Sequence, residues 1–233
     1  MNKKFIFLLF WLVFVSGCAH VQKDYVFQNA LFSVFESGSY NGTMTLDELK
    51  DHGNFGIGTV NALDGEMIVL DGDFYQVKAD GKVYLLRKQV QSPFAEVNFF
   101  EPDQIFFPGW NLDYAALCDY IDKFTGSKDK FYAIKVQGKF KSVKVRSVPA
   151  QTQPYPTLKE ALMNQKIFNY DDIEGTLVGF RFPQYMDKLN VPGYHLHFLS
   201  QDKSRGGHLL DCRINDVSIE VDELSKYTLE VAK

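Results

Sequence analysis

The chain has 233 residues, of which 45% are hydrophobic and 15% aromatic, so it can bury a full core as one domain or two compact halves. This composition excludes a disordered protein. The net charge is −4, with both signs interspersed and no basic run interleaved with aromatic residues, which argues against a nucleic-acid partner and favours a small polar ligand.

The beginning of the chain predicts export. A short positive segment precedes an apolar run of about 11 residues, which is too short to span a bilayer comfortably and is typical of a secretory signal peptide. Residues 15–18 read Val-Ser-Gly-Cys and resemble a bacterial lipobox, which implies cleavage directly before Cys18 and lipid attachment to its thiol. We therefore expect a lipoprotein signal peptide over residues 1–17, a tether over residues 18–24 and a periplasmic or otherwise extracytoplasmic protein anchored to a membrane. An ordinary signal peptide and a short membrane anchor are the alternatives.

An N-terminal half rich in β-strands is expected over residues 25–150. Its first segment, residues 25–35, is apolar and predicts a strand, and a capping box at residues 45–48 opens a short helix that continues to about residue 52. Residues 55–77 alternate strands with Asp-Gly turns, a pattern typical of tight hairpins.

Glu66 is unusual because it opens the apolar run of residues 67–70 beside one of these turns. A carboxylate in that position is either a solvated strand end or a group aimed into a site, and the residues alone favour the solvated end. Residues 83–90 continue the sheet, and residues 92–108 predict a strand followed by a surface loop.

The middle of the chain predicts one helix and two strands. Residues 111–124 carry apolar side chains at helical spacing, and Thr125-Gly126 ends that helix. Residues 130–148 predict two strands around a Gln137-Gly138 turn. Arg146 lies on the face of the second strand opposite its valines, which an exposed polar face would explain.

Two cysteines outside the lipobox, Cys118 in the predicted helix and Cys212 near the carboxyl end, could pair in an oxidising compartment. Nothing in the sequence brings the two together. We therefore expect two buried free thiols, with a disulfide as the alternative.

The proline-containing segment 149–156 predicts a joint, and a C-terminal half follows over residues 151–233. A second capping box at residues 157–160 repeats the first, and residues 175–177 echo residues 58–60. These echoes predict an α+β fold of two similar β-rich halves with mixed or antiparallel sheets and a few short helices.

If the halves are built alike, equivalent strands face each other across the joint. The strand of Glu66 would then face the strand of His195, and the active site would lie between the halves.

The main chemical signal is a predicted hairpin over residues 194–214, which holds three of the five histidines of the chain. Side chains two apart on a strand share a face, so His195 and His197 point together, and His208 arrives on the return strand after a Gly-Gly turn. Three neutral imidazoles with an open fourth position are typical of catalytic zinc. A polar strand face without a metal is the alternative.

The hairpin and three other blocks resemble the acetolactate decarboxylase family over nearly the whole mature chain, from about residue 25 to the final strand. The blocks are Gly58-Thr59 with Leu63-Asp64-Gly65-Glu66, Gly138-Lys139-Phe140 through Val145-Arg146, Tyr194-His195-Leu196-His197-Phe198, and Gly206-Gly207-His208-Leu209-Leu210-Asp211.

The resemblance implies a function and a set of site residues. By family analogy the metal ligands are His195, His197 and His208, and the polar groups of the active site are Thr59, Glu66 and Arg146. The implied reaction is the decarboxylation of 2-acetolactate to acetoin, with Zn²⁺ acting as a Lewis acid on the ketone and hydroxyl oxygens. The resemblance thus reverses the solvated interpretation of Glu66 and the exposed interpretation of Arg146.

One departure and two alternatives accompany the resemblance. The family pattern includes a further glutamate near the carboxyl terminus, for which Glu230 is a candidate replacement. The alternative functions are an exported metal-binding module with the same fold and no turnover, and a cupin-like metal oxygenase. A homodimer stays open.

Overall fold

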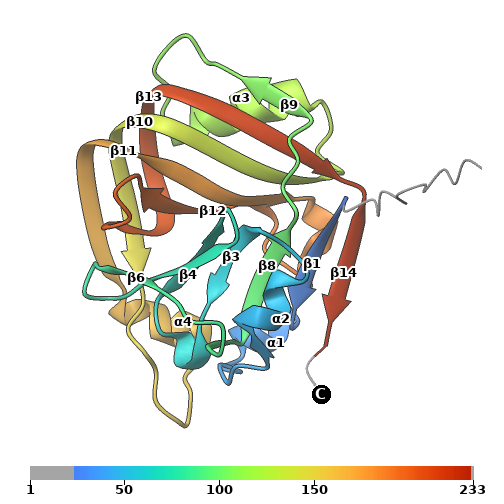
Figure 1. The fold of residues 1–233 in the computed structure, drawn as a ribbon, viewed down its shortest axis with the longest axis vertical. Helices are drawn as coiled ribbons and strands as arrows, with labels where there is room; N and C mark the ends of the chain where they lie inside the picture. Colours follow the sequence, from blue (N-terminus) through green and yellow to red (C-terminus); the bar gives the residue numbers. More distant parts are fainter. Residues whose placement is uncertain (1–23, 232–233) are drawn as a thin grey trace, which may run out of the picture.

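The computed structural model describes residues 24–231, so the expected signal peptide, Cys18 and most of the tether lie outside the described residues. Two β-sheets dominate these residues, and short helices lie at their ends (Figure 1). The first sheet has the order β14 (Lys226–Glu230), β1 (Tyr25–Asn29), β8 (Phe94–Asn98), β3 (Phe55–Thr59), β4 (Glu66–Leu70), β5 (Asp73–Val77) and β6 (Val83–Leu85). The second has the order β10 (Phe131–Ser147), β11 (Lys166–Phe182), β12 (Gly193–Ser200), β13 (Gly206–Leu224) and β9 (Gln104–Phe106).

The remaining elements are short. A small two-stranded sheet pairs β2 (Met44–Thr45) with β7 (Gln91–Ser92). The α-helices are α1 (Phe32–Glu36), α2 (Leu46–Lys50), α3 (Tyr114–Thr125) and α4 (Leu158–Ala161), and the 3₁₀ turns are η1 (Asn61–Leu63), η2 (Leu162–Asn164) and η3 (Gln184–Met186). The expected β-rich fold with a few short helices is confirmed. Among residues 24–231, no helix is long and apolar enough to cross a membrane.

The sheets divide the chain at a different place from the boundary expected at residue 150. Strand β10 belongs to the second sheet, because it pairs with β11 on one side and β13 on the other. Strand β14 returns to the first sheet, where it runs parallel to β1. The expected joint at residues 149–156 therefore leads from β10 to α4 and does not separate the two sheets.

The second sheet closes on itself around its own core. Strand β12 pairs with β11 and β13, and β10 pairs with the same two strands, so the four strands form a ring. Large apolar side chains fill the ring, among them Phe140, Leu196 and Phe198. Burial of such side chains stabilises the fold by about 1.5–3 kcal/mol each.

A second core lies between the sheets. Ile57 and Ile68 of the first sheet pack there with Val178 and Phe180 of the second. This packing holds β11 against β3 and β12 against β4, which is the arrangement that brings the site together.

Two of the expected strand assignments are wrong. Residues 25–35 divide into β1 and α1, and Ala30 between them adopts a left-handed backbone with φ of 65°. The expected Gln137-Gly138 turn is part of the continuous strand β10, because Gly138 pairs with β11 and β13 at once. A Cβ at Gly138 would lie 2.2 Å from the carbonyl oxygen of Asp216, so only glycine fits between the neighbouring strands.

Other local expectations are confirmed. Thr45 accepts a hydrogen bond from the amide of Glu48 and so opens α2 with the expected capping box, and Thr157 does the same for α4. Asp113 caps α3, whose buried residues include Leu117 and Ile121. Each cap satisfies amide groups that the first helical turn leaves without partners.

A buried polar cluster lies at the edge of the first sheet that β8, β1 and β14 form. Glu96 is fully buried there, directly opposite Gln28 in the strand register. The Gln28 side chain accepts hydrogen bonds from Asn190 and from the Tyr227 hydroxyl, both at 2.5 Å. Burial raises the pKa of Glu96 to about 8, and the nearby Asn190 only partly offsets this effect, so the carboxyl is neutral at pH 7.

Candidate metal and active site

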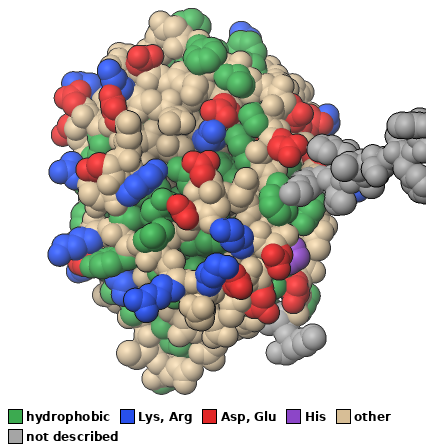
Figure 2. All heavy atoms as spheres, in the orientation of Figure 1, with side chains coloured by type: hydrophobic (Ala, Val, Ile, Leu, Met, Phe, Trp, Pro, Cys, Tyr) green, Lys and Arg blue, Asp and Glu red, His purple; other side chains and the backbone are tan. Residues whose placement is uncertain are grey.

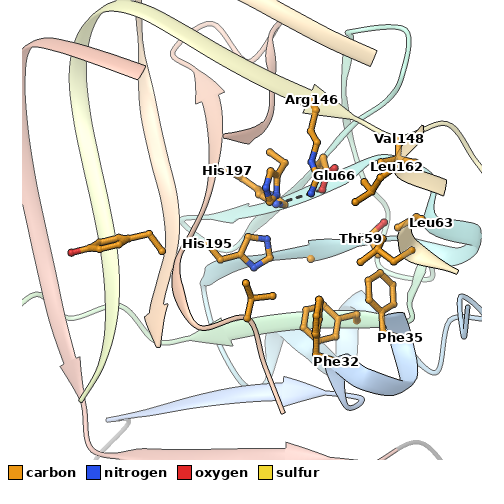
Figure 3. A pocket seen from close by; sticks show the side chains of 16 residues that line it. Phe32, Phe35, Thr59, Leu63, Glu66, Arg146, Val148, Leu162, His195 and His197 are labelled. Carbon is orange, nitrogen blue, oxygen red and sulfur yellow. Dashed lines mark ion pairs between the residues drawn. The ribbon is translucent and has the colours of Figure 1, made fainter. Parts of the chain in front are cut away.

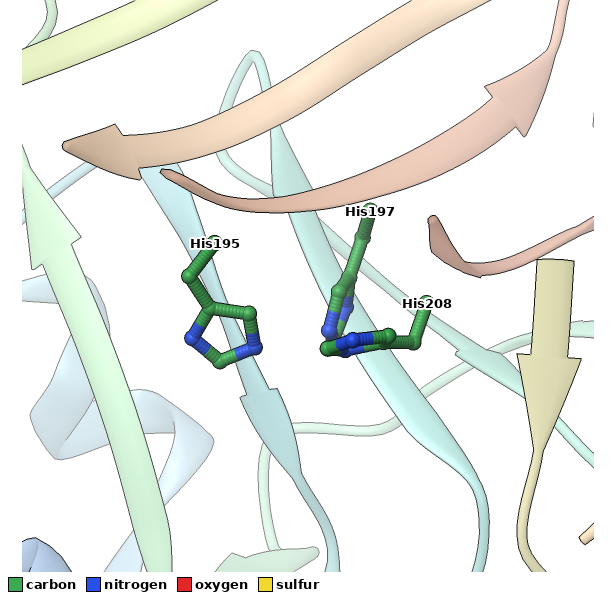
Figure 4. A group of neighbouring side chains, drawn as sticks. All are labelled: His195, His197 and His208. Carbon is green, nitrogen blue, oxygen red and sulfur yellow. The ribbon is translucent and has the colours of Figure 1, made fainter. Parts of the chain in front are cut away.

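The three histidines of the hairpin converge as expected (Figure 4). His195 and His197 project from one face of β12, while Leu196 between them points into the ring core. His208 at the start of β13 is the direct register partner of His197. The ligand nitrogens of the three rings lie within 4.8 Å of one another, and the ring centroids are 5.0 to 5.3 Å apart.

The protonation state of these rings suits a metal. Burial, with a smaller effect of the Arg146 charge, lowers the pKa of His195 to about 3. Burial also holds the pKa values of His197 and His208 well below the ordinary value, so all three rings are neutral at pH 7. The Nδ1 of His195 and the Nε2 of His197 are buried and have no hydrogen-bond partner among residues 24–231. Neutral, convergent and unpartnered ring nitrogens fit a divalent cation.

The first sheet orients one of the rings. His197 Nδ1 lies 2.9 Å from the carbonyl oxygen of Met67 on β4. A carbonyl only accepts, so Nδ1 carries the hydrogen and donates it, and the lone pair of Nε2 is left for a metal.

Three irregularities in the pairing of β10 with β13 aim the polar groups of the second sheet. Lys141 is an extra residue on β10, and Asn215 and Leu210 are extra residues on β13. Each extra residue exchanges the inward and outward faces of the strand beyond it, because side chains alternate at every residue. As a result Arg146 and His208 face the first sheet, and they are direct register partners.

Gly207 is required by the close packing beside His208. Its φ is +141°, and a Cβ on it would lie 2.5 Å from the carbonyl oxygen of Arg146. The Gly-Gly pair that sequence analysis read as the end of a turn therefore belongs to β13.

Glu66 reaches the site from the first strand position of β4 (Figure 3). It is only 9% exposed, and its Oε2 lies 3.5 Å from the Nε2 of His197. Burial raises the pKa of Glu66 to about 7, while the Arg146 charge acts in the opposite direction. The interpretation as a solvated strand end is thus wrong, because Glu66 is buried beside His197.

Arg146 and Thr59 complete the polar groups. The Nε of Arg146 is buried with no partner in the described chain, and its Nη1 makes one long hydrogen bond, 3.4 Å, to the Gln165 side chain. Thr59 is buried, and its hydroxyl donates to the carbonyl oxygen of Gly65 at 2.6 Å.

All six residues line one cavity of about 290 Å³ (Figure 3). The rest of its wall is mainly apolar and includes Phe32, Phe35, Leu63, Phe94, Val148, Leu158, Leu162 and Val191. The sequence did not indicate this wall. Its residues come from α1, η1, β8, α4, η2 and the segments that follow β10 and η3, and apolar residues in short elements carry no signal that separates a cavity wall from a core.

Glu230 does not line this cavity. It is exposed on β14, where it is the register partner of Asn29. Cys118 and Cys212 are both free, and Cys212 is buried while Cys118 is half-buried.

Comparison with known proteins agrees with these geometric features. Residues 26–233 match the family model described as alpha-acetolactate decarboxylase. The chain is 41% identical over 217 residues to the alpha-acetolactate decarboxylase of Methanosarcina mazei, covering 93% of this chain and 75% of that protein. It is 44% identical over 207 residues to that of Methylococcus capsulatus, covering 88% of this chain and 79% of the relative. A crystal structure of the Bacillus subtilis alpha-acetolactate decarboxylase superposes with a TM-score of 0.88 at 35% identity, over 90% of this chain and 89% of the other. The chain therefore belongs to the alpha-acetolactate decarboxylase family, a family of carboxy-lyases.

Proposed function

We propose that this protein decarboxylates 2-acetolactate to acetoin at a zinc ion bound by His195, His197 and His208. Family membership supports the reaction. The observation that carries the proposal is that three neutral imidazoles, a carboxyl and a guanidinium meet in one cavity. Three nitrogen ligands with room for oxygen ligands favour zinc among the common divalent ions.

The substrate determines what the site has to do. 2-Acetolactate has a carboxylate on C2, which also bears a hydroxyl, and a ketone on C3. When the bond between C1 and C2 breaks, carbon dioxide leaves and its electron pair moves toward the ketone, and a proton is then added at C2 to give acetoin. A bound zinc ion supplies Lewis acidity to the ketone and hydroxyl oxygens.

Arg146 is suited to bind the substrate carboxylate. Its guanidinium lines the cavity beside the imidazoles, and its long hydrogen bond to Gln165 leaves most of its donors available. A guanidinium binds a carboxylate through two parallel hydrogen bonds, which would orient the group that leaves.

Glu66 is suited to move a proton at the substrate hydroxyl. Its Oε2 faces His197, and a carboxyl whose pKa is about 7 exchanges protons readily at neutral pH. Thr59 already uses its hydrogen on Gly65, so its oxygen is available to accept a hydrogen bond from the same hydroxyl.

The decisive experiment measures metal content and acetoin together. We expect one zinc per chain and acetoin formation in the wild type, and loss of both in His197→Ala. The matched control is His52→Ala, because His52 stacks on Phe27 with ring centroids 3.7 Å apart and does not line the cavity. Full zinc content and turnover in His197→Ala would refute the proposal. Zinc without acetoin would indicate a metal-binding module, and iron with oxygen uptake would indicate a cupin-like oxygenase.

We also propose that the protein is exported and anchored to a membrane through lipid on Cys18. The support is the lipobox at residues 15–18 and the apolar run before it. Cys18→Ser should move the protein from the membrane fraction to the soluble fraction. Unchanged membrane association of that variant would contradict the anchor.

A further inference from the structure

A group of aromatic side chains lies at the surface end of the second sheet. This aromatic patch consists of Phe106, Phe107, Trp110, Tyr120 and Phe124, from β9, the loop after it and α3. Phe107 is 73% exposed, Trp110 61% and Phe124 45%. Single exposed apolar residues are common, but large aromatic residues gathered in one area mark an interaction surface.

Ring contacts join four members of the patch, and Phe107 lies beside them in the chain. The Tyr120 ring lies 6.2 Å from Trp110 and 4.7 Å from Phe124, and Phe106 lies 4.9 Å from Phe124, measured between centroids. In Figure 2 hydrophobic side chains are visible at the end of the molecule where Figure 1 places β9 and α3.

The loop of the patch is uncharged and mostly exposed. Residues 104–112 read Gln-Ile-Phe-Phe-Pro-Gly-Trp-Asn-Leu, with no charged side chain. A Cβ on Gly109 would meet no atom within 4 Å, so the tip of the loop is open to solvent at Gly109, while the neighbouring Pro108 is buried. Aromatic rings flanking an uncharged tip favour the boundary between lipid headgroups and acyl chains, where tryptophan is enriched.

The start of β9 lies close to Asp24, where the expected tether joins the body, and the patch begins at Phe106, which pairs with Ile219, six residues before Ser225. Asp24, the first described residue, accepts a hydrogen bond from the amide of Ser225, and two residues earlier the amide of Glu223 donates to Asp103, directly before β9. Residues 18–23 span roughly 20 Å at full extension, so a lipid on Cys18 keeps this end of the body near the bilayer.

We propose that the aromatic patch contacts the membrane surface, with Phe107 and Trp110 inserted at the headgroup boundary. This inference rests on the proposed lipid anchor. The anchor and the patch then give two points of attachment, which together fix how the body lies on the bilayer. The alternative is that a second copy of this chain covers the aromatic patch, and the test has to distinguish the two.

The sequence provides its own reporter, because its two tryptophans are Trp11 and Trp110. In full-length protein carrying Trp11→Phe, Trp110 is the single tryptophan whether or not the leader is cleaved. The protein is reconstituted into phosphatidylcholine vesicles and into vesicles whose phosphatidylcholine has brominated acyl chains, and flotation measures how much is bound.

We expect Trp110 emission to shift to shorter wavelength on binding and to be quenched by the brominated chains. Phe107→Ser should lose most of this quenching while acetoin formation and flotation stay unchanged. The matched control is Leu85→Ser on β6. Leu85 is 67% exposed and lies outside the patch, so this variant should keep the quenching.

Each other outcome is decisive. Flotation with equal Trp110 emission in both kinds of vesicle overturns the patch and leaves the anchor intact. Loss of flotation overturns the anchor and the inference together. A shift in emission that depends on protein concentration and not on lipid assigns the patch to a second copy of the chain and overturns the inference.

Discussion

The substitution Glu96→Gln tests whether the buried carboxyl of β8 makes stability depend on pH. Glu96 is fully buried, and its pKa is about 8 in the folded protein against an ordinary value of 4.5. The folded state therefore holds a proton that the unfolded state has released across this interval. The stabilising effect is complete below pH 4.5 and is lost as the pH rises through about 8.

The magnitude follows from the proton count. Each pH unit over which the two states differ by one proton changes the free energy of unfolding by about 1.36 kcal/mol. Between pH 6 and pH 9 the proton difference at Glu96 amounts to about two pH units in total, so the wild type should lose about 3 kcal/mol through this group. Glutamine has nearly the same shape and no proton to lose.

The assay is urea unfolding of the wild type and Glu96→Gln at pH 6, 7.5 and 9. The loss of stability over this range should be about 3 kcal/mol smaller in the variant. Asp222 is also buried, and its pKa is raised to about 7, so part of the wild-type loss should remain. Glu101→Gln is the control, because Glu101 is exposed in the same region. Equal pH dependence in wild type and Glu96→Gln would refute the argument.

Three further predictions concern the site. Arg146→Lys removes the guanidinium that can bind a carboxylate through two hydrogen bonds, and hydrogen bonds to charged groups contribute about 1.5–3 kcal/mol. The variant should lower kcat/KM for 2-acetolactate about 10- to 100-fold with zinc content unchanged. An unaltered rate would exclude carboxylate binding by Arg146. Gly207→Ala places a methyl group against the Arg146 carbonyl and should destabilise the fold by about 1–3 kcal/mol in urea unfolding; wild-type stability would mean that β10 and β13 can separate there. Glu230→Gln should leave acetoin formation unchanged, because Glu230 is exposed and does not line the cavity; a large loss of rate would show that this residue reaches the site.

Local signals in the sequence predicted the hairpin of the site well. Alternation placed His195 and His197 on one face, and the capping boxes of Thr45 and Thr157 are present. These features depend on neighbours within a few residues along the chain. A sequence therefore displays them directly.

Pairings between distant strands could not be predicted in the same way. Strand β10 belongs to the second sheet because it pairs with β11 and β13. The residues of a strand do not show which distant strands it pairs with. The positions of Glu66 and Arg146 are similar cases. The residues alone favoured solvent for both side chains, because their burial depends on how the two sheets pack. The echoes between the halves placed the strand of Glu66 opposite that of His195, and for Arg146 only the family resemblance indicated a site.

The bulges at Lys141 and Leu210 have a consequence for judging other members of the family. Deleting either residue would change no catalytic side chain, yet it would turn Arg146 or His208 toward the interior of the ring. A homologue could thus keep every reactive group and still lack a working centre. Single-residue gaps inside these two strands therefore deserve the same weight as a lost histidine when activity is assigned by alignment.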